Sequence, residues 1–263
     1  MASDYDHRFH VGNHADVWKH VAWLALLAGL KREQLAILDT HAGRGGYALD
    51  RPGEWRDGVG RLLEAFPDGA STGSGAVDRY LARIRRHGPG RYPGSPVLSI
   101  GAMGRADRLV AHELDPDAAK GLRRALDGDS RAAVREDDGF AAAAGAEPGA
   151  VVLIDPPYVS PKDWTDASDA VVAAGRARVM LWYPIKRWTR PNALLARIAA
   201  AGVRSVALDL LVDPDLKGSS LGGSGVVLVN APPSVLVELA AAGPVLGPIL
   251  GVEGRWRLRV TGS

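Results

Sequence analysis

Cysteine is absent from all 263 residues of the chain. This absence excludes disulfide bonds, thiolate zinc sites, iron–sulfur clusters and cysteine nucleophiles, so any catalysis must use other groups. No apolar run approaches the roughly 20 residues that a membrane-spanning helix needs. Residues 1–20 are too polar and too rich in histidine for a signal peptide. We therefore expect a compact cytoplasmic protein with no membrane partner.

The chain also lacks a strong net charge. Its 32 basic and 30 acidic residues give +2 and a pI near 9.0, which allows a polyanionic partner but indicates one only weakly. Locally, residues 79–91 carry five arginines and no acid: Arg79, Arg83, Arg85, Arg86 and Arg91. Such a cluster suits phosphate binding, and it equally suits an ordinary solvated helix face.

Helix-like and strand-like segments alternate along the sequence. Residues 15–30 space their apolar side chains as a helix does. The apolar run 35–39 passes into a glycine turn at 42–46, which indicates a strand followed by a tight loop. Further short apolar runs end near Glu113, near Arg135, at Asp155 and at Tyr183. The alternation predicts a mainly parallel sheet covered by helices.

Two more strands are expected at 203–211 and 225–229, joined by a turn-rich segment and forming an antiparallel edge pair. The whole pattern predicts an α/β fold whose seven-stranded sheet is mainly parallel with one antiparallel strand.

One spacing predicts an insertion. In nucleotide-binding sheets the ribose-binding acid typically follows the glycine turn by roughly 20 residues, whereas Glu113 lies 70 residues beyond Gly43. We expect residues 50–93 to form a small inserted helical subdomain that projects over the site. Residues 1–49 and 94–263 would then form the main domain.

The four residues Asp155-Pro156-Pro157-Tyr158 follow an apolar run that suits a central buried strand. Asp155 should emerge at the carboxyl end of that strand, where open α/β sheets place their active sites. The two prolines lack N–H groups and keep the backbone extended, so carbonyl groups stay free to accept hydrogen bonds. The alternative is a proline pair that merely ends a strand.

This motif suits methylation of an exocyclic amine such as N6 of adenine. The amine is a poor nucleophile because its lone pair is delocalised into the ring, so its hydrogens need two acceptors and the base needs a flat support. The Asp155 carboxylate and the Pro156 carbonyl would be the acceptors, and Tyr158 would stack on the base. Asp155 would also take the released proton. We expect these three residues to be catalytic.

Upstream residues fit the methyl donor S-adenosylmethionine. Gly43 allows close backbone approach, Glu113 offers a carboxylate to ribose hydroxyls, and Asp138-Gly139 suits a contact with the adenine amine of the cofactor. A glycine-rich turn alone would equally fit a dinucleotide enzyme, but its combination with these acids and Asp155 favours methyl transfer. The sulfonium group supplies the activation, so no metal is expected.

Five of the seven histidines lie at His7, His10, His14, His20 and His41. Their spacings match no compact zinc motif, and no cysteine accompanies them. Structural roles, solvent exposure, and contacts to cofactor or substrate remain open for them.

Five segments together resemble the RlmJ family: YDHRFHVGNHADVWKH at 5–20, DTHAG at 39–43, YPGSP at 92–96, IDPPY at 154–158 and LWYP at 181–184. The matches occur in family order and extend from residue 5 to at least residue 225. The resemblance implies a Rossmann-like class I S-adenosylmethionine-dependent methyltransferase with a small helical insertion. It also implies methylation of N6 of an adenine in 23S ribosomal RNA, numbered 2030 in the family's activity.

The resemblance further implies site residues and partners. The family's members act on protein-free ribosomal RNA as monomers. Departures from the family pattern occur at Asp6, Val11 and residues 230–233, and they bear on RNA affinity rather than on the chemistry. Tyr5 and His7 would meet the target adenosine, and cofactor contacts would come from Lys19 or His20, His41, Ser95, Glu113, Asp138 with Gly139, and Asp155.

Two other functions stay open at this point. The same four residues at 155–158 would also serve adenine in DNA or glutamine in proteins, although roughly 50 inserted residues are few for base-by-base reading of DNA. A non-catalytic cofactor-binding or RNA-binding module is the second alternative. The complete set of acids and the intact Asp-Pro-Pro-Tyr sequence argue against it.

Overall fold

A mixed sheet organises the computed structural model, which describes residues 10–30, 34–216 and 221–262. Within this part of the chain the sheet has eight strands in the order β10-β8-β9-β7-β6-β1-β4-β5. Its parallel half consists of β5 (Ala132–Arg135), β4 (Arg108–His112), β1 (Ala36–Asp39), β6 (Val151–Ile154) and β7 (Arg178–Ile185). The predicted α/β methyltransferase fold is confirmed, with the mainly parallel character of the sheet.

The other end of the sheet corrects the prediction of seven strands with one antiparallel strand. Here β9 (Gly223–Val229) runs antiparallel to β7 and to β8 (Ser205–Leu211), as expected for that pair. An additional strand, β10 (Arg257–Gly262), pairs antiparallel with β8 and takes the edge position. Its apolar side chains alternate with arginines, and Leu258 is only partly buried while Val260 is exposed, so the sequence gives a weak signal for it.

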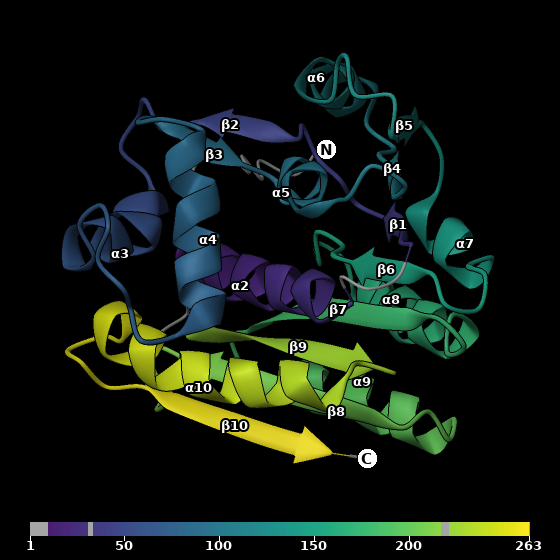
Figure 1. Ribbon diagram of the computed structural model, residues 1–263. Coiled ribbons are helices and arrows are strands. Elements are labelled where there is room, and N and C mark those ends of the chain that lie inside the picture. The colour runs from purple at the N-terminus through teal and green to yellow at the C-terminus, as the bar shows by residue number, and fades with distance from the viewer. Residues whose placement is uncertain (1–9, 31–33, 217–220, 263) are drawn as a thin grey trace.

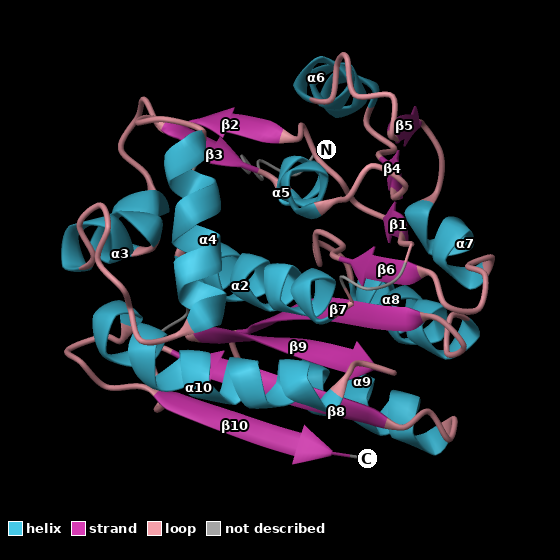
Figure 2. Ribbon diagram, viewed as in Figure 1, coloured by secondary structure: helices cyan, strands magenta, loops and turns pink. Residues whose placement is uncertain are grey.

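Helices cover both faces of the sheet (Figures 1 and 2). One face carries α2 (His14–Gly29), α5 (Ser95–Ala102) and α10 (Pro233–Leu250), and the other carries α7 (Gly139–Ala144), α8 (Pro161–Ala173) and α9 (Thr189–Ala200). A further helix, α6 (Pro116–Ala125), packs on β5. Alternate side chains of a strand pack against the helices on opposite faces of the sheet. In β6, Val151 and Leu153 belong to one hydrophobic cluster, and Val152 and Ile154 belong to the other.

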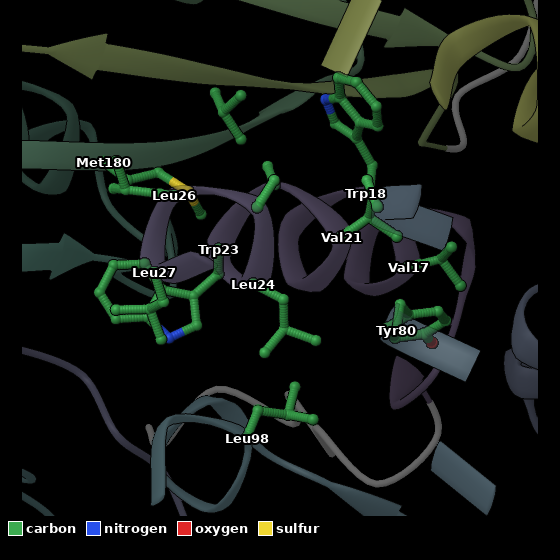
Figure 3. Packing of buried hydrophobic residues seen from close by; sticks show 14 of the residues in the cluster. Val17, Trp18, Val21, Trp23, Leu24, Leu26, Leu27, Tyr80, Leu98 and Met180 are labelled. Atoms are coloured by element: carbon green, nitrogen blue, oxygen red, sulfur yellow. The ribbon is translucent and has the colours of Figure 1, made fainter. Parts of the chain in front are cut away.

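The first described helix, α2, is buried on nearly all sides. The Asn13 side chain begins it by accepting hydrogen bonds from two backbone amides. Its indole groups donate to neighbouring layers, Trp18 to the Leu208 carbonyl and Trp23 to the Ser99 hydroxyl. Figure 3 shows Trp18, Trp23 and the leucines of α2 pointing outward to different partners, with Met180 near Leu26. A helix that is apolar all round in this way lies inside the fold, where it fixes the polar residues at its start.

Several short elements lie between β1 and β4, the region where the sequence analysis places an inserted helical subdomain at 50–93. This region contains η1 (Glu54–Asp57), α3 (Val59–Ala65) and α4 (Gly75–Arg86), and a small antiparallel pair, β2 (Gly46–Ala48) with β3 (Arg91–Pro93), closes its base. Helix α4 packs on α2 and α10 and shares their hydrophobic cluster. The insertion is thus joined to the core, and its division from residues 1–49 and 94–263 as a domain stays a prediction.

Helix α10 is more apolar than the sequence analysis expects. Among the described residues it is the one helix that matches a membrane span in length and composition. It packs on α2, α4, β8 and β10, and Val235, Leu239, Leu246 and Leu250 are buried in the main cluster. These contacts make α10 a core helix.

Candidate active site

A large cleft of about 1930 Å³ opens at the carboxyl end of the parallel strands. Its wall includes the segments that follow β1, β4, β5, β6 and β7, the start of α2, and residues between β1 and β4 such as Glu54, Tyr92 and Ser95. This is the position at which open α/β sheets bind ligands. The cleft brings together the predicted residues Lys19, His20, His41, Gly43, Ser95, Glu113, Asp138, Gly139, Asp155, Pro156 and Tyr158.

A buried ion pair lies at the centre of the cleft wall. The Lys19 ammonium donates to Asp155 Oδ2 at 2.7 Å and lies 2.8 Å from Asp16 Oδ1. The ammonium also lies 5.3 Å from the centre of the Trp182 ring, within cation–π distance. Burial acts to lower the pKa of Lys19, but the two carboxylates together raise it above its ordinary value. Lys19 is therefore a fixed cation that holds the Asp155 carboxylate in place.

Tyr158 adopts an uncommon backbone conformation. Its φ of 52° lies in the left-handed region, which costs a residue with a side chain about 1–2 kcal/mol. Its hydroxyl donates to the Trp182 carbonyl at 2.6 Å, and its ring lies 4.5 Å from the Trp164 ring. Burial raises the pKa of Tyr158 well above its ordinary value, so the hydroxyl stays a neutral donor. These contacts hold the ring at the cleft and stabilise the strained backbone.

The glycine turn after β1 is tied to the end of β4. Glu113 accepts hydrogen bonds from the backbone amides of Gly43 at 2.9 Å and Asp115 at 2.8 Å. Gly43 has a φ of 61°, and a Cβ there would lie 2.4 Å from the Tyr47 hydroxyl. The left-handed backbone therefore favours glycine at this position, and a side chain would also displace the Tyr47 hydroxyl. Each Glu113 oxygen keeps a lone pair that can accept a hydroxyl group of a ribose.

At the end of β5, Asp138 caps α7 by accepting from the Phe140 amide at 2.8 Å. The next residue, Gly139, packs directly on the chain after β1, because a Cβ there would lie 1.8 Å from the Thr40 carbonyl oxygen. The two loops thus approach each other as closely as backbone allows. They form a narrow shelf that suits a flat nucleoside ring.

His41 extends this shelf as a neutral imidazole. Burial lowers its pKa to about 4. The Thr40 hydroxyl donates to the Leu153 carbonyl and lies 2.7 Å from His41 Nδ1, so Nδ1 carries the proton and donates to that hydroxyl. Nε2 is consequently left as an acceptor.

Beneath the shelf, the Asp39 carboxylate is fully buried, with neither oxygen in a hydrogen bond of normal geometry among the described residues. Burial raises its pKa to about 7, against the opposing effect of the nearby Ser95 side chain and with a further increase from the Asp155 charge.

Two other predicted cofactor residues lie on the opposite side of the turn. His20 Nδ1 lies 2.8 Å from the Tyr92 hydroxyl, which in turn contacts the Tyr80 hydroxyl at 3.1 Å. His20 is therefore held by a buried chain of polar groups that reaches into the insertion. Ser95 is buried at the start of α5 and borders the cleft.

The described part of the amino-terminal segment begins at His10. Tyr5 and His7, predicted to bind substrate, lie outside the described residues, as does Asp6. His10 borders the cleft and lies 2.9 Å from Glu54, whereas His14 contacts the Leu221 carbonyl, and burial lowers the pKa of His14. No group of three or more potential metal ligands occurs in the described ranges.

Sequence reasoning did not assign several residues that shape the cleft. Asp16 completes the Lys19 ion pair, and Trp164 and Trp182 pack around Tyr158. Trp182 lies within the 181–184 segment that resembles the RlmJ family and near the carboxyl end of the strand next to β6. That position in the sequence could have marked Trp182 as a residue of the cleft. Trp164 lies in α8, and nothing in the sequence pattern distinguishes it from a core residue.

Two of the five arginines at 79–91 form ion pairs within the fold. Arg79 pairs with Glu238 of α10, and Arg85 pairs with Asp68 at 2.6 Å. Only Arg86 and Arg91 of this cluster are strongly exposed. None of the five borders the cleft.

The α/β sheet with its cleft at the strand ends, taken together with the family match described next, defines the class: this is an S-adenosylmethionine-dependent methyltransferase. A family model described as "Ribosomal RNA large subunit methyltransferase D, RlmJ" matches residues 32–261. The chain therefore belongs to the RlmJ family, as its sequence motifs predict.

Individual relatives agree with this membership. Ribosomal RNA large subunit methyltransferase J of Haemophilus influenzae is 30% identical over 274 aligned positions, which cover 95% of each chain. The Escherichia coli protein of the same name is 32% identical and covers 87% of each chain. A crystal structure of a Legionella pneumophila protein superposes with a TM-score of 0.83 at 25% identity, covering 96% of this chain and 98% of that one.

Proposed function

We propose that this enzyme transfers a methyl group from S-adenosylmethionine to N6 of an adenine in 23S ribosomal RNA, the adenine numbered 2030 in the family's activity. The observation that carries the proposal is the Lys19–Asp155 pair beside Tyr158 in a cleft with aromatic walls. Membership in the RlmJ family supports ribosomal RNA as the substrate.

The described residues fit the cofactor. Glu113 would accept hydrogen bonds from the ribose hydroxyls, and the shelf at Asp138-Gly139 would hold the adenine ring with Asp138 near its amine. His41 Nε2 offers a neutral acceptor, and Ser95 and His20 would border the methionine part. When bound, S-adenosylmethionine supplies an electrophilic methyl group on a positively charged sulfur.

The acceptor base would lie between Tyr158 and the Asp155 carboxylate. One N6 hydrogen would be bound by Asp155 and the other by the Pro156 carbonyl, so the nitrogen lone pair turns out of conjugation and toward the methyl group. Lys19 keeps Asp155 in the orientation that this hydrogen bond needs. Tyr158 supplies the flat surface on which the base stacks.

The electron and proton balance is simple. The N6–carbon bond forms as the sulfur–carbon bond breaks, and the electron pair of the broken bond remains on sulfur, which becomes a neutral thioether. The nitrogen then loses one proton, which passes to Asp155 and from there to water in the open cleft. This scheme requires no metal ion from the enzyme.

The target adenine must leave its stack to reach this site, because Asp155 is only slightly exposed in the wall of the cleft. Tyr5 and His7 would contact the extruded nucleoside from the amino-terminal segment. We further propose that the enzyme acts as a monomer in the cytoplasm on RNA that is free of ribosomal proteins.

The proposal is tested by methyl transfer from labelled S-adenosylmethionine to unmodified 23S RNA, with mass-spectrometric mapping of the product. We expect N6-methyladenine at a single position. Equal labelling of DNA or of peptides containing glutamine would contradict RNA as the substrate, and cofactor binding without transfer to any RNA would indicate a non-catalytic module. Assembled ribosomal subunits, offered in parallel, test the requirement for protein-free RNA.

A further inference from the structure

A group of cations that the catalytic scheme does not use lies where β7 passes into α9. Lys186, Arg187 and Arg190 are all exposed and all border the cleft. No carboxylate within the described ranges lies at ion-pair distance from any of the three. We name these three residues the β7–α9 basic strip.

The strip adjoins the wall on which the acceptor base would stack. The Tyr158 hydroxyl donates to the carbonyl of Trp182, and Lys186 follows Trp182 by four residues along the same strand end. Pro184 lies between them and also borders the cleft. A nucleotide chain that places one base against Tyr158 would therefore pass its neighbouring phosphates over this segment.

The opposite wall of the cleft is mainly acidic, although it also carries Arg44. Glu113, Asp115, Asp137 and Asp138 border the cleft at the ends of β4 and β5. These acids suit a positively charged cofactor with ribose hydroxyls, and they repel a polyanion. The division of charge across one cleft thus directs RNA to the β7–α9 side.

The segment that displays the strip is held by the core. The Trp188 ring packs against the Arg259 guanidinium of β10 at 4.6 Å, and Pro191 is buried beneath the first turn of α9. The edge strand β10 therefore supports the backbone of the β7–α9 basic strip, while the charged groups of Lys186, Arg187 and Arg190 stay in solvent. Such an arrangement presents cations to a partner without using them for stability.

From these observations we infer that the β7–α9 basic strip binds the phosphates flanking the target adenine and so sets the direction in which RNA enters the cleft. This inference rests on the proposed function. It assigns the phosphate contacts to Lys186, Arg187 and Arg190 rather than to the arginines at 79–91. Of those arginines, Arg79 and Arg85 are engaged in ion pairs within the fold.

The test compares three multiple variants of the full chain. The strip variant is Lys186→Gln, Arg187→Gln and Arg190→Gln. The matched control is Lys120→Gln, Arg124→Gln and Arg204→Gln, which removes three exposed cations away from the cleft. A third variant, Arg86→Gln with Arg91→Gln, removes the exposed part of the insertion cluster.

The probe is an unmodified 23S RNA fragment, and its Kd is measured over a range of salt concentrations together with kcat and KM for methyl transfer. For the strip variant we expect roughly 10-fold to 100-fold weaker RNA binding at about 0.15 M salt, and a salt slope lower by about 2. KM for RNA should rise while kcat at saturating RNA and the affinity for S-adenosylmethionine stay within about twofold. The matched control should bind RNA as the wild type does.

Unchanged RNA affinity in the strip variant would overturn the inference while leaving the proposed function intact, provided that the wild type methylates the fragment. Equal losses in the strip variant and the matched control would also overturn it, since they indicate only a general charge effect. Loss confined to the Arg86 and Arg91 variant would assign the phosphates to the insertion instead. A wild type that neither binds nor methylates RNA would reject the proposed function itself, and the strip assignment with it.

Discussion

The two walls of the cleft differ in how their functional groups are held. On the cofactor side, backbone amides fix the acids, as the amides of Gly43 and Asp115 do for Glu113. On the acceptor side, side chains hold one another, as Trp164 and Tyr158 do through ring contact. The three cations of the β7–α9 basic strip have no carboxylate at ion-pair distance within the described ranges. Rigid backbone groups can bind a small ligand of constant shape, whereas flexible side chains are better suited to bind a long polyanion.

The Lys19–Asp155 pair stands between these walls and belongs to both. In the proposed mechanism it is the point at which the methyl donor and the acceptor amine meet. The comparison of the two walls therefore gives distinct predictions, because changes on one side should alter cofactor binding and changes on the other should alter RNA binding. Changes at the centre should alter the chemical step.

The largest effect is expected for Asp155→Ala. Loss of the oriented acceptor should lower kcat by about 10³-fold at saturating S-adenosylmethionine and RNA, since one positioned group of this kind contributes about 10²–10⁴. Steady-state transfer of labelled methyl groups measures the change. Asp166→Asn on the exposed face of α8 is the matched control and should keep full activity. Full activity in Asp155→Ala would remove this carboxylate from the mechanism.

Lys19→Met tests whether the central ion pair supports both stability and chemistry. It leaves Asp16 and Asp155 buried without their cation, and we expect a loss of about 3–5 kcal/mol in the free energy of unfolding. Urea denaturation provides the measurement. Lys162→Met, which breaks an exposed pair on α8, should leave the denaturation midpoint unchanged.

A double variant then separates the two roles of Lys19. If Lys19 acts on the reaction through Asp155, the variant lacking both side chains should have the same kcat as Asp155→Ala alone. If the loss of kcat in the double variant equals the product of the losses in the two single variants, Lys19 contributes to the reaction by another route.

On the cofactor side, the buried Asp39 should make the free energy of unfolding depend on pH. Its pKa is raised from 3.8 to about 7 in the folded protein, so the folded state holds a proton that the unfolded state has released. The contribution of the protonated Asp39 to the free energy of unfolding is present in full below about pH 4 and is lost as pH rises through about 7. Asp39→Asn should therefore be more stable than the wild type at pH 8, by on the order of 3 kcal/mol, with the difference shrinking toward pH 4.

Thermal or urea unfolding of both proteins at several pH values measures this difference. A difference that grows as pH falls would contradict the buried neutral acid. His41 shifts stability in the opposite direction, since its lowered pKa makes the folded state lose stability as pH falls from about 6.5 toward 4. Comparison of wild type and variant at each pH cancels that contribution.

Gly139→Ala should damage the cofactor side alone. The added Cβ would meet the Thr40 carbonyl oxygen at 1.8 Å, which forces the two loops apart. We expect about 1–3 kcal/mol of destabilisation and an affinity for S-adenosylmethionine roughly 10-fold weaker by calorimetry. RNA affinity should not change. Gly46→Ala is the control, because a Cβ there meets nothing within 4 Å; the same loss in that variant would point to a general effect of the turn.

The sequence predicts the cofactor side better than the acceptor side, for a physical reason. Backbone-built sites need particular residues at strand ends, so Gly43, Glu113 and Asp138 were visible from spacing, and the 70-residue gap revealed the insertion. Contacts between side chains from distant elements leave no such local pattern. The tilted ring contact between Trp164 and Tyr158 and the Lys19–Asp155 ion pair emerge only when α2, β6 and α8 are brought together.

The sequence pattern is equally limited in showing which charged residues border the cleft and which strand forms the edge of the sheet. Five arginines close together in sequence drew attention to residues 79–91, but the fold pairs two of them with acids from other segments. The three cations at 186–190 are fewer, yet they border the cleft. Strand β10 was missed because the alternation of its arginines with Leu258 and Val260 resembles a polar tail.

The smallest effect is expected for Trp164→Phe, which keeps an aromatic ring beside Tyr158 but reduces its area. The ring contact at 4.5 Å supports the left-handed backbone of Tyr158, so a smaller partner should loosen the surface on which the acceptor base stacks. We expect KM for RNA to rise about threefold, with an unchanged affinity for S-adenosylmethionine. A matching change at Trp188, whose ring packs on Arg259 away from Tyr158, should leave the stacking surface intact. Fluorescence of an adenine analogue placed at the target position reports stacking directly, and equal quenching in Trp164→Phe and wild type would show that Tyr158 holds the base without help from α8.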